Sequence, residues 1–582
     1  MTETFADEAS AITIPSLFKS DLVIKFGDIL ETPTIFPDEQ GKVKVVVTNQ
    51  GIGRFRGPLD LNLYASTDPV LDDNPLNTLD LPLRGKDELL GTLNLNNVNL
   101  KPGQSKTFTL DFSKPEFRTA SVVSPGSYYL IAEVDPGNSI RESNENNNQA
   151  STHISTDGTD VVLDWNSTLL NAIQAVATRP ITAPPFGARN SAIVHAAIYD
   201  AVNAIDRSYT PYLVNIDASR TGASPEAAVV GAAYQTLINL YPTEAAAFEA
   251  QRLRSLAEIP DGAAEDAGFA LGVSVANQIL ALRSNDGAAT ADNVPYTVPP
   301  APGVWRPTPI DDGLGGFRTE EPLLVGWGEV TPFAIPSVED VLQGTGVDGP
   351  PALDSIQYAE EIEEVRLFGG LENTEVTTIA RTAEQTEIAQ FWAYDRPDTF
   401  RPPGQYNELA QEVALQQGNT LVQNARLFAL LNIAMADAGI VTWDVKYDTQ
   451  VADTLGFNQW RPVTAIREAD TDGNPDTIQD PNWKPLLDTP PFPDYISGHA
   501  TFGAAAGQIL ASFFGTDNIS FDIPSQELPG VAREFGSFSE FVEENALSRV
   551  YGGIHFRSSA EDGVIAGTAV GDYVFGHVAT LV

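Results

Sequence analysis

Cysteine is absent from this chain of 582 residues. Its absence excludes disulfide bonds, thiolate metal sites and cysteine nucleophiles. Basic residues are scarce as well, because 34 lysines and arginines stand against 78 acidic residues and give a formal net charge of −44. A surface of that sign repels nucleic acid, so no nucleic-acid partner is expected.

Long uncharged runs are also rare, and the longest lies around residues 495–516. It contains Ser497, His499, Thr501 and Gln508, so a buried helix explains it better than a membrane span, and no transmembrane segment is expected. Residues 1–20 have neither a basic cluster nor a continuous apolar core. They are therefore interpreted as a polar N-terminal tail, with no signal peptide for secretion.

Residues 21–157 carry the alternation and the turn signals of short β-strands. Apolar or alternating stretches lie at 42–47, 61–64, 105–112 and 127–132. Turn sequences such as Asn49-Gln50-Gly51 and Asp135-Pro136-Gly137 separate them. Several short strands at this spacing predict an antiparallel β-sandwich.

The end of this block resembles the CARDB family, the cell-adhesion-related immunoglobulin-like domains of bacteria. The resemblance rests on residues 134–148 and on the early strand and turn at 45–51, and it covers most of the block. It favours an extracellular, periplasmic or cell-surface location, although no export signal is seen. The Asn/Asp/Glu cluster within 134–148 offers oxygens for calcium. A β-turn rich in residues that tolerate left-handed geometry is the simpler interpretation.

Residues 158–582 differ in composition and periodicity, with alanine-rich stretches of helical period. These lie at 167–177, 190–205, 225–240, 244–257, 263–283, 406–445 and 500–514, and they predict amphipathic or buried helices. The segment 293–351 is rich in Pro and Gly but holds Trp305 and Trp327, so it predicts an ordered loop around a core. The predicted fold class is multidomain β + α: a sandwich followed by a mainly α-helical bundle domain.

Two of the five histidines stand in settings that suit an oxyanion. His499 follows a Ser-Gly pair and leads directly into a small-residue helix, whose first backbone N–H groups favour negative charge. His555 comes six positions after Arg549, and Arg461 lies upstream. Two guanidinium groups, a Ser-Gly corner and two imidazoles would form a cage for a tetrahedral oxyanion. The remaining histidines, His153, His195 and His577, are interpreted as structural or as bystanders.

In this order, the motifs Arg461-Pro462, Ser497-Gly498-His499 and Arg549 to His555 resemble those of the vanadium-dependent haloperoxidases. These enzymes belong to the type 2 phosphatidic acid phosphatase/haloperoxidase superfamily. The resemblance spans nearly the whole helical region. It implies the haloperoxidase helical fold and oxidation of halide by hydrogen peroxide to hypohalous acid. The halide and the organic acceptor stay open, as does a homodimer or higher homo-oligomer, since bundles of this family often pair.

The resemblance also implies a role for each residue. His555 would bind vanadium through a ring nitrogen, and His499 would be the acid–base group. Arg461, Arg549, Ser497 and the N–H of Gly498 would hold the oxygens of vanadate, and phosphate fits the same site. Phe492 lies five residues before Ser497, and a phenylalanine at this position resembles the chloroperoxidase type.

The family places a lysine seven residues before the first arginine, where this chain has Thr454. The nearest lysine, Lys446, lies fifteen residues before Arg461, as though about eight residues within 448–456 were inserted. An insertion inside a continuous helix would rotate Lys446 away, whereas a bulged loop would spare it. Because Lys446 and Lys484 are the only lysines after residue 158, we expect a bulged loop and a role for Lys446 in holding the cofactor.

Two other functions fit the same residues. An acid phosphatase of the same superfamily would carry phosphohistidine at His555, with His499 protonating the leaving group. A non-catalytic surface or adhesion protein would use its CARDB domain alone. The displaced lysine is the feature that favours the phosphatase.

Overall fold

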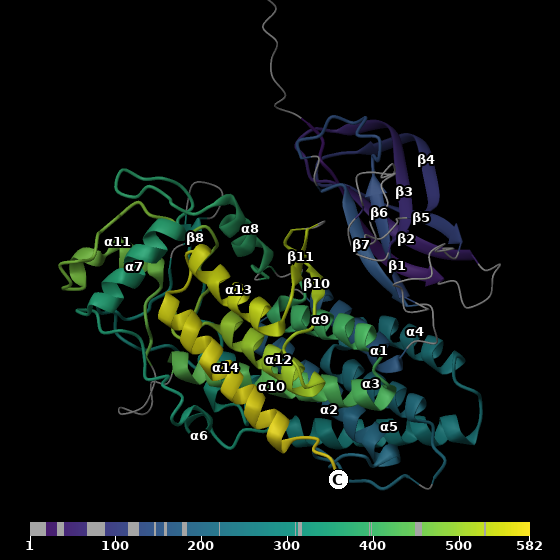
Figure 1. The fold of residues 1–582 in the computed structure, drawn as a ribbon. Helices are drawn as coiled ribbons and strands as arrows, with labels where there is room; N and C mark the ends of the chain where they lie inside the picture. Colours follow the sequence, from purple (N-terminus) through teal and green to yellow (C-terminus); the bar gives the residue numbers. More distant parts are fainter. Residues whose placement is uncertain are drawn as a thin grey trace, which may run out of the picture. The chain divides into compact units, whose positions relative to one another are not determined.

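The computed structural model describes residues 19–31, 40–66, 71, 88–113, 127–144, 147–155, 160–176, 183–219, 221–308, 310–311, 317–394, 396, 399–447, 457–528 and 531–582. The chain divides into two compact units: residues 1–158 with 529–532, and residues 159–528 with 533–582 (Figure 1). The predicted tail up to residue 18, the predicted boundary at 157–158 and residues 145–146 of the 134–148 cluster lie outside the described residues.

The first unit consists of two antiparallel sheets, ordered β1-β2-β5 and β4-β3-β6-β7. Alternate residues of both sheets, among them Val43, Val45 and Val47 of one and Leu61 and Leu63 of the other, pack into one core. The predicted sandwich is therefore confirmed. Its strands are β1 (Leu22–Glu31), β2 (Gln40–Asn49), β3 (Phe55–Ser66), β4 (Glu88–Leu100), β5 (Ser105–Ser113), β6 (Ser127–Val134) and β7 (Gln149–Ser155).

The second unit is mainly helical, as predicted. Its helices are α1 (Val161–Ala175), α2 (Pro184–Asp206), α3 (Pro225–Leu240), α4 (Ala245–Ala257), α5 (Ala263–Arg283), α6 (Val338–Leu342), α7 (Ile356–Phe368), α8 (Ala383–Phe391), α9 (Arg401–Gln417), α10 (Leu421–Tyr447), α11 (Pro462–Arg467), α12 (Gly498–Phe514), α13 (Phe538–Tyr551) and α14 (Arg557–His577). Short strands β8 (Ile310–Asp311), β9 (Phe317–Arg318), β10 (Phe521–Pro524) and β11 (Ala532–Phe535), and 3-10 turns η1 (Pro242–Glu244), η2 (Ala288–Asn293), η3 (Trp327–Glu329) and η4 (Ala469–Thr471), complete the elements.

The prediction of one helical stretch over 406–445 is wrong, because α9 and α10 are separate helices. Gly418 ends α9 with a φ of 66°, the left-handed conformation that glycine adopts without a steric penalty. Its N–H bonds back to the carbonyls of Ala414 and Leu415. The chain then turns and α10 begins at Leu421.

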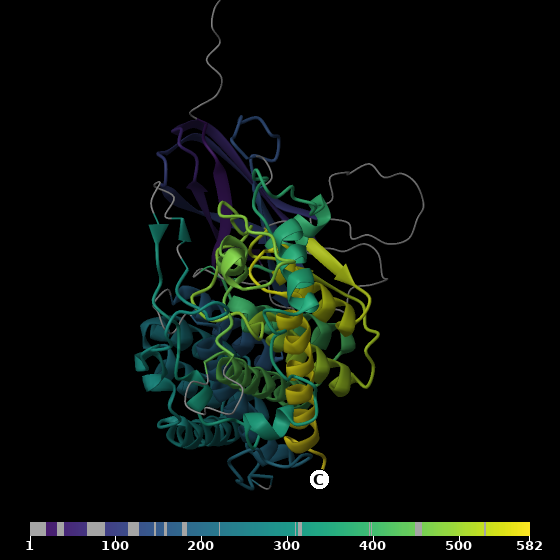
Figure 2. The ribbon, with the colours of Figure 1, turned by 90° about the vertical axis from the view of Figure 1, so that its left-hand side faces the viewer.

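α10 is the core helix of this unit. Among the described residues it alone is long and apolar enough to cross a membrane, and 94% of that apolar window is buried inside the fold. It packs against α2, α12 and α14. The green α10 and the yellow C-terminal helices lie together in Figure 1 and again in the turned view of Figure 2.

The Pro- and Gly-rich segment 293–351 is ordered in its described parts, as expected. Trp305 and Trp327 are 0% and 1% exposed. The backbone N–H of Trp305 donates to the carbonyl of Asn458 at 2.6 Å. This segment therefore packs against the chain that leads from α10 to Arg461.

Candidate active site

The structure brings the predicted site residues together from separate parts of the helical unit, and all of them are buried. Their positions are the last turn of α10 (Lys446), the residue before α11 (Arg461), the start of α12 (Ser497, Gly498 and His499), the last turn of α13 (Arg549) and the turn before α14 (His555).

His555 presents one ring nitrogen to the cationic groups and the other to a hydroxyl. Its Nε2 lies 3.1 Å from Nη1 of Arg461, and its Nδ1 lies 3.0 Å from Oγ of Ser559. Because arginine is always a donor, Nε2 must accept, and the neutral ring carries its hydrogen on Nδ1. The lone pair of Nε2 therefore points towards the guanidinium of Arg461. A ring nitrogen must be unprotonated in this way to bind a metal.

The turn that carries His555 depends on a glycine. Gly553 has a φ of 75°, and a Cβ there would lie 2.2 Å from the carbonyl oxygen of Gly369. The backbone N–H groups of Ile554 and His555 then point back to the carbonyl of Arg549, at 3.2 and 3.4 Å. This geometry fixes the imidazole close to the end of α13.

Arg461 is held by backbone carbonyls on both sides. Its Nε donates to Phe492 at 2.8 Å, and its Nη1 donates to Ile554 at 2.6 Å. The guanidinium also lies over the ring of Phe492, 4.9 Å from the centroid. These contacts restrict its rotation, so the group is preorganised for an anion.

Lys446 reaches the same segment from α10. Its Nζ donates to the carbonyls of Pro493 and Asp494, both at 2.7 Å, and lies 5.2 Å from the centroid of the Phe492 ring. The segment 448–456, where we predicted an insertion, lies outside the described residues. On either side of it, however, Phe457 and Asn458 bond back to the carbonyls of Val445 and Lys446, so the chain leaves and rejoins the last turn of α10.

Arg549 and His499 are both anchored to the chain after α8. Nη1 of Arg549 donates to the carbonyl of Trp392 at 2.6 Å, and Nε2 of His499 lies 3.0 Å from the carbonyl of Ala393. The hydrogen of neutral His499 is thus on Nε2, and Nδ1 is the acceptor.

The start of α12 is buried and carries polar groups that can bond to a ligand. Ser497 caps the helix only loosely, because its Oγ lies 3.5 Å from the N–H of Ala500. A Cβ on Gly498 would touch Trp443 at 3.6 Å without a clash, so packing alone does not require glycine there. The first N–H groups of the helix add a favourable field for an anion.

The basic groups act strongly on one another. Burial, and then the charge of Arg461, lower the pKa of Lys446 well below its usual value. Burial and the charges of Arg461, Lys446 and Arg549 likewise lower the pKa of His555. For His499, burial and Arg549 lower the pKa most. The potential at the site is therefore positive, and an anion would relieve the repulsion.

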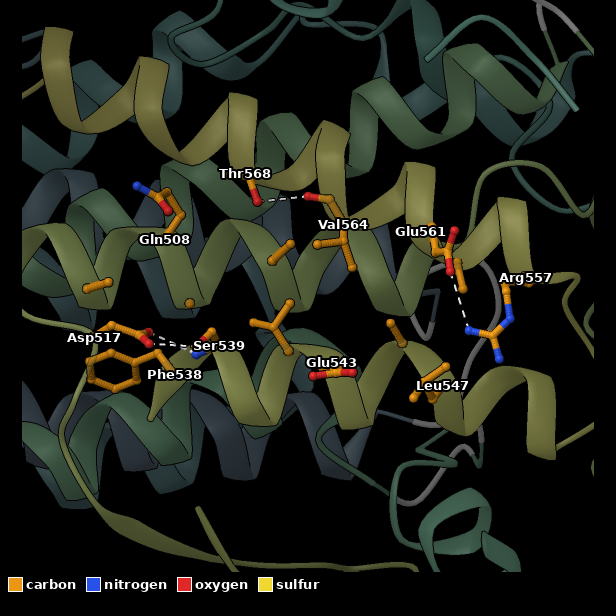
Figure 3. A pocket seen from close by; sticks show the side chains of 16 residues that line it. Gln508, Asp517, Phe538, Ser539, Glu543, Leu547, Arg557, Glu561, Val564 and Thr568 are labelled. Atoms are coloured by element: carbon orange, nitrogen blue, oxygen red, sulfur yellow. Dashed lines mark hydrogen bonds and ion pairs between the residues drawn. The ribbon is translucent and has the colours of Figure 1, made fainter. Parts of the chain in front are cut away.

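A small cavity separates the two histidines. Its volume of about 10 Å³ is close to the room that one water-sized molecule needs. The walls are largely apolar and aromatic: Pro184, Pro402, Trp443, Pro490, Phe492, Gly498, His499, Phe502, Ile554 and His555. A second, larger pocket of about 360 Å³ lies between α12, α13 and α14 and contains none of the predicted site residues. Figure 3 shows its ends marked by the Arg557–Glu561 ion pair and by the Asp517–Ser539 hydrogen bonds.

The other histidines lie in different surroundings. His195 is fully buried on α2, with Nε2 3.1 Å from Oδ1 of Asn166 and its ring stacked on Phe428. His577 is exposed and stacks on Tyr573. For His153, in β7, the side chain is outside what the structure describes. Within the described ranges, no three His, Asp or Glu residues form a group that could hold a metal cation.

Sequence reasoning missed four partners of the site. They are the carboxylate of Asp494, the hydroxyl of Ser559 and the consecutive carbonyls of Trp392 and Ala393. Asp494 lies within the motif stretch 492–500. A charged residue among apolar neighbours there was the signal that could have identified it. The carbonyls leave no side-chain signal at all.

Comparisons with known proteins agree with this geometry. A family model described as the VCPO second helical-bundle domain matches residues 426–582, and the CARDB model matches residues 19–152. The vanadium chloroperoxidase of Curvularia inaequalis is 29% identical over 503 residues, which cover 69% of this chain and 79% of that protein.

Two solved structures share the fold of the helical unit. The first bacterial vanadium-dependent iodoperoxidase is 27% identical, covers 73% of this chain and 98% of its own, and gives a TM-score of 0.59. A holo-type bacterial vanadium-dependent chloroperoxidase is 16% identical, covers 69% and 94%, and gives a TM-score of 0.53. The chain thus consists of an N-terminal CARDB domain and a helical domain of the vanadium haloperoxidase type.

Proposed function

We propose that this chain is a vanadate-dependent haloperoxidase that oxidises halide with hydrogen peroxide to hypohalous acid. Its homology to vanadium chloro- and iodoperoxidases indicates a peroxidase. The observation that carries the proposal for this chain is the contact of Arg461 Nη1 with the acceptor nitrogen Nε2 of His555, in a site where the charges of Lys446 and Arg549 also act on that ring.

The donor set fits an oxyanion. Guanidinium and ammonium groups, together with N–H groups at the start of α12, are donors to oxygen. One imidazole lone pair, at Nε2 of His555, accepts from Arg461 and would bond to the central atom when an anion displaces that contact. This set suits vanadate, and phosphate as its mimic, better than a metal cation, which prefers several carboxylate or imidazole ligands.

In this proposal His555 binds vanadium through Nε2. Lys446, Arg461, Arg549, Ser497 and the N–H of Gly498 hold the oxygens and balance their charge. Bound vanadate would supply a Lewis-acidic centre that activates hydrogen peroxide towards halide. Because the cationic groups are buried and held by backbone carbonyls, they stabilise charge without first having to reorganise.

His499 would handle the proton. Its Nε2 is committed to the carbonyl of Ala393, so protons enter and leave at Nδ1. In the absence of an anion, burial and then the charge of Arg549 lower the pKa of His499, which favours a neutral ring that can accept a proton. A bound oxyanion would raise the pKa of His499 and let the ring return that proton.

The acid phosphatase is the second candidate, because phosphate fits the same donors. The spacing of the lysine was the feature that favoured it. Nζ of Lys446 is bonded to the carbonyl of Asp494 beside the site. The spacing of the lysine therefore no longer favours the phosphatase, and we retain the haloperoxidase. Halide preference is not assigned, since the relatives are named for chloride and for iodide.

The test measures two reactions on the same full-length protein. The chain, freed of bound anions, is supplied with orthovanadate, hydrogen peroxide and bromide or iodide, and bromination or iodination of phenol red is followed. Hydrolysis of p-nitrophenyl phosphate is measured in parallel. We expect halogenation that requires vanadate. Hydrolysis without vanadate, and inhibited by it, would identify the phosphatase, and neither activity would favour the adhesion protein.

A further inference from the structure

Asp494 is a fully buried carboxylate beside the proposed cofactor site, 0% exposed. Its backbone is fixed on three sides. The N–H donates to the carbonyl of Gln459 at 2.9 Å, and the carbonyl accepts from Lys446 Nζ at 2.7 Å and from Ser559 Oγ at 3.0 Å. The side chain therefore has little freedom in where it points.

The carboxylate points at the back of the His555 ring. Oδ1 of Asp494 lies 3.3 Å from Nδ1 of His555 and 3.9 Å from Nη1 of Arg461. The opposite ring nitrogen, Nε2, is the one that faces the cations. Ser559 also contacts Nδ1, at 3.0 Å, but its hydroxyl hydrogen is given to the carbonyl of Asp494. Ser559 Oγ is therefore the hydrogen-bond acceptor for Nδ1, Asp494 orients that hydroxyl through its carbonyl, and the Asp494 carboxyl group faces Nδ1 through the 3.3 Å charge contact.

Carboxylates in this position have a known physical effect on imidazole ligands. An acceptor at one ring nitrogen fixes the hydrogen there, leaves the lone pair on the other and makes that lone pair a stronger donor. Removing such a partner usually weakens binding of the metal about 10- to 100-fold. Little solvent screens the Asp494 carboxyl group from the ring, and the same burial raises the pKa of Asp494 to about 7.

We propose that Asp494 is a positioning residue that orients His555 and strengthens its Nε2 as the ligand of vanadium. The inference rests on the proposed function and adds a residue to which no role was assigned above. Asp494 acts through His555 and does not itself contact the oxyanion. It thus favours an anion whose central atom bonds to nitrogen over one that is held by charge alone.

Vanadate and inorganic phosphate separate this role from the alternatives. Both are tetrahedral oxyanions that the cations can hold, but only vanadium is expected to form a lasting bond to Nε2. Equilibrium dissociation constants for both anions are measured by calorimetry on the full-length wild type and on Asp494→Asn, which keeps the shape and loses the charge. Glu543→Gln, a carboxylate at the separate large pocket, is the matched control.

The expected result is a 10- to 100-fold weaker binding of vanadate by Asp494→Asn, with phosphate binding unchanged or tighter and Glu543→Gln like the wild type. Equal weakening of both anions would reveal a merely structural role and overturn the inference. Tighter binding of both anions would show that the Asp494 charge repels them, and unchanged binding of both would show that Asp494 has no role. Either result would overturn the inference. A wild type that binds no vanadate would instead reject the proposed function.

A second measurement does not depend on the variant folding. Because the chain has only five histidines, the ring nitrogens can be resolved by ¹⁵N NMR of histidine-labelled wild-type protein, with assignment by single replacements. His555 is expected to show a hydrogen-bonded Nδ1–H and an unprotonated Nε2. A hydrogen on Nε2 of His555 would overturn the inference.

Discussion

Nε2 of His555 lies 3.1 Å from Nη1 of Arg461, although the two residues are 94 positions apart in the chain. Arginine stays protonated in proteins, so this contact places the imidazole lone pair on the side of the guanidinium. The same guanidinium is fixed to the carbonyls of Phe492 and Ile554. A preformed nitrogen ligand and a preformed cation therefore face one another, and the predictions below follow from that arrangement.

Replacing His499 by alanine should abolish most turnover and leave vanadate binding largely intact. His499 is bonded to Ala393 and not to the groups that hold the anion, and a general acid–base group contributes roughly 10²- to 10⁴-fold in rate. Steady-state halogenation and vanadate calorimetry measure the two effects. His577→Ala, on an exposed histidine, should match the wild type. Full activity of His499→Ala would contradict the assigned role.

Replacing Lys446 by methionine should weaken vanadate binding and lower the rate. Lys446 is one of the cations that act on His555, and loss of one buried charge donor costs roughly 1.5–3 kcal/mol. That loss corresponds to about 10- to 100-fold in affinity. The control is Lys484→Met, the other lysine of the helical region. Equal affinities of the two variants would show that Lys446 does not hold the cofactor.

Arg549→Lys should also fail to bind vanadate normally, although the charge is kept. Lysine lacks the planar fork that lets one guanidinium group bond Trp392 and an oxyanion together. We expect about a tenfold or greater loss in affinity. Arg426→Lys, on α10 and bonded to the carbonyl of Ala579, tests for a general effect of the substitution. If calorimetry shows that Arg549→Lys binds like the wild type, the bidentate role is wrong.

Phosphate should stabilise the vanadate-free protein. Burial and mutual repulsion lower the pKa of Lys446, His499 and His555, and a bound anion offsets that repulsion. At a concentration 100 times its dissociation constant a ligand stabilises the folded state by about 2.7 kcal/mol. Scanning calorimetry at constant ionic strength measures the shift in Tm. A shift that chloride reproduces would point to general salt screening.

His195 should make the protein less stable in acid. Burial lowers the pKa of His195 from 6.5 to about 3, so between these values the unfolded state binds a proton that the folded state does not. The free energy of unfolding from this residue is therefore largest above the unfolded pKa and falls as the pH drops. In His195→Gln, urea unfolding at pH values from about 4 to 6 should depend on pH by one proton less. His577→Gln should keep the wild-type dependence.

The sequence predicted the type of each unit because the patterns there are local. Alternation in Val43, Val45 and Val47 marks a half-buried strand, and the alanine-rich periods mark helices. No stretch was predicted for β1, β4 or β7; in β4, Gly91 and several asparagines interrupt the pattern. The helices α6, α8, α11, α13 and α14 were missed too, and α14 shows why.

α14 carries glycines at positions that resemble helix breakers. A Cβ on Gly567 would lie 2.2 Å from the carbonyl oxygen of Thr501, and one on Gly563 would lie 2.9 Å from that of Ser497. These glycines let α14 pack tightly against α12. Their purpose is visible only when the neighbouring helix is in place, so local propensity did not predict this helix.

In the candidate site, too, some residues could be predicted from the sequence and others could not. Side chains with a recognisable motif, such as Ser497 and His499, were found from the sequence. The groups that orient them were not, because the carbonyl of Ala393 is 106 residues from His499 and any residue supplies a carbonyl. Lys446 was the intermediate case, since its position depended on how the chain crosses 448–456.

The most direct measurement is a crystal structure of the full-length protein with orthovanadate. The account predicts vanadium bonded to Nε2 of His555, with oxygens within hydrogen-bond distance of Lys446, Arg461 and Arg549. Vanadate bound elsewhere, or a hydrogen on Nε2 with no anion beside it at saturating vanadate, would contradict the central claim.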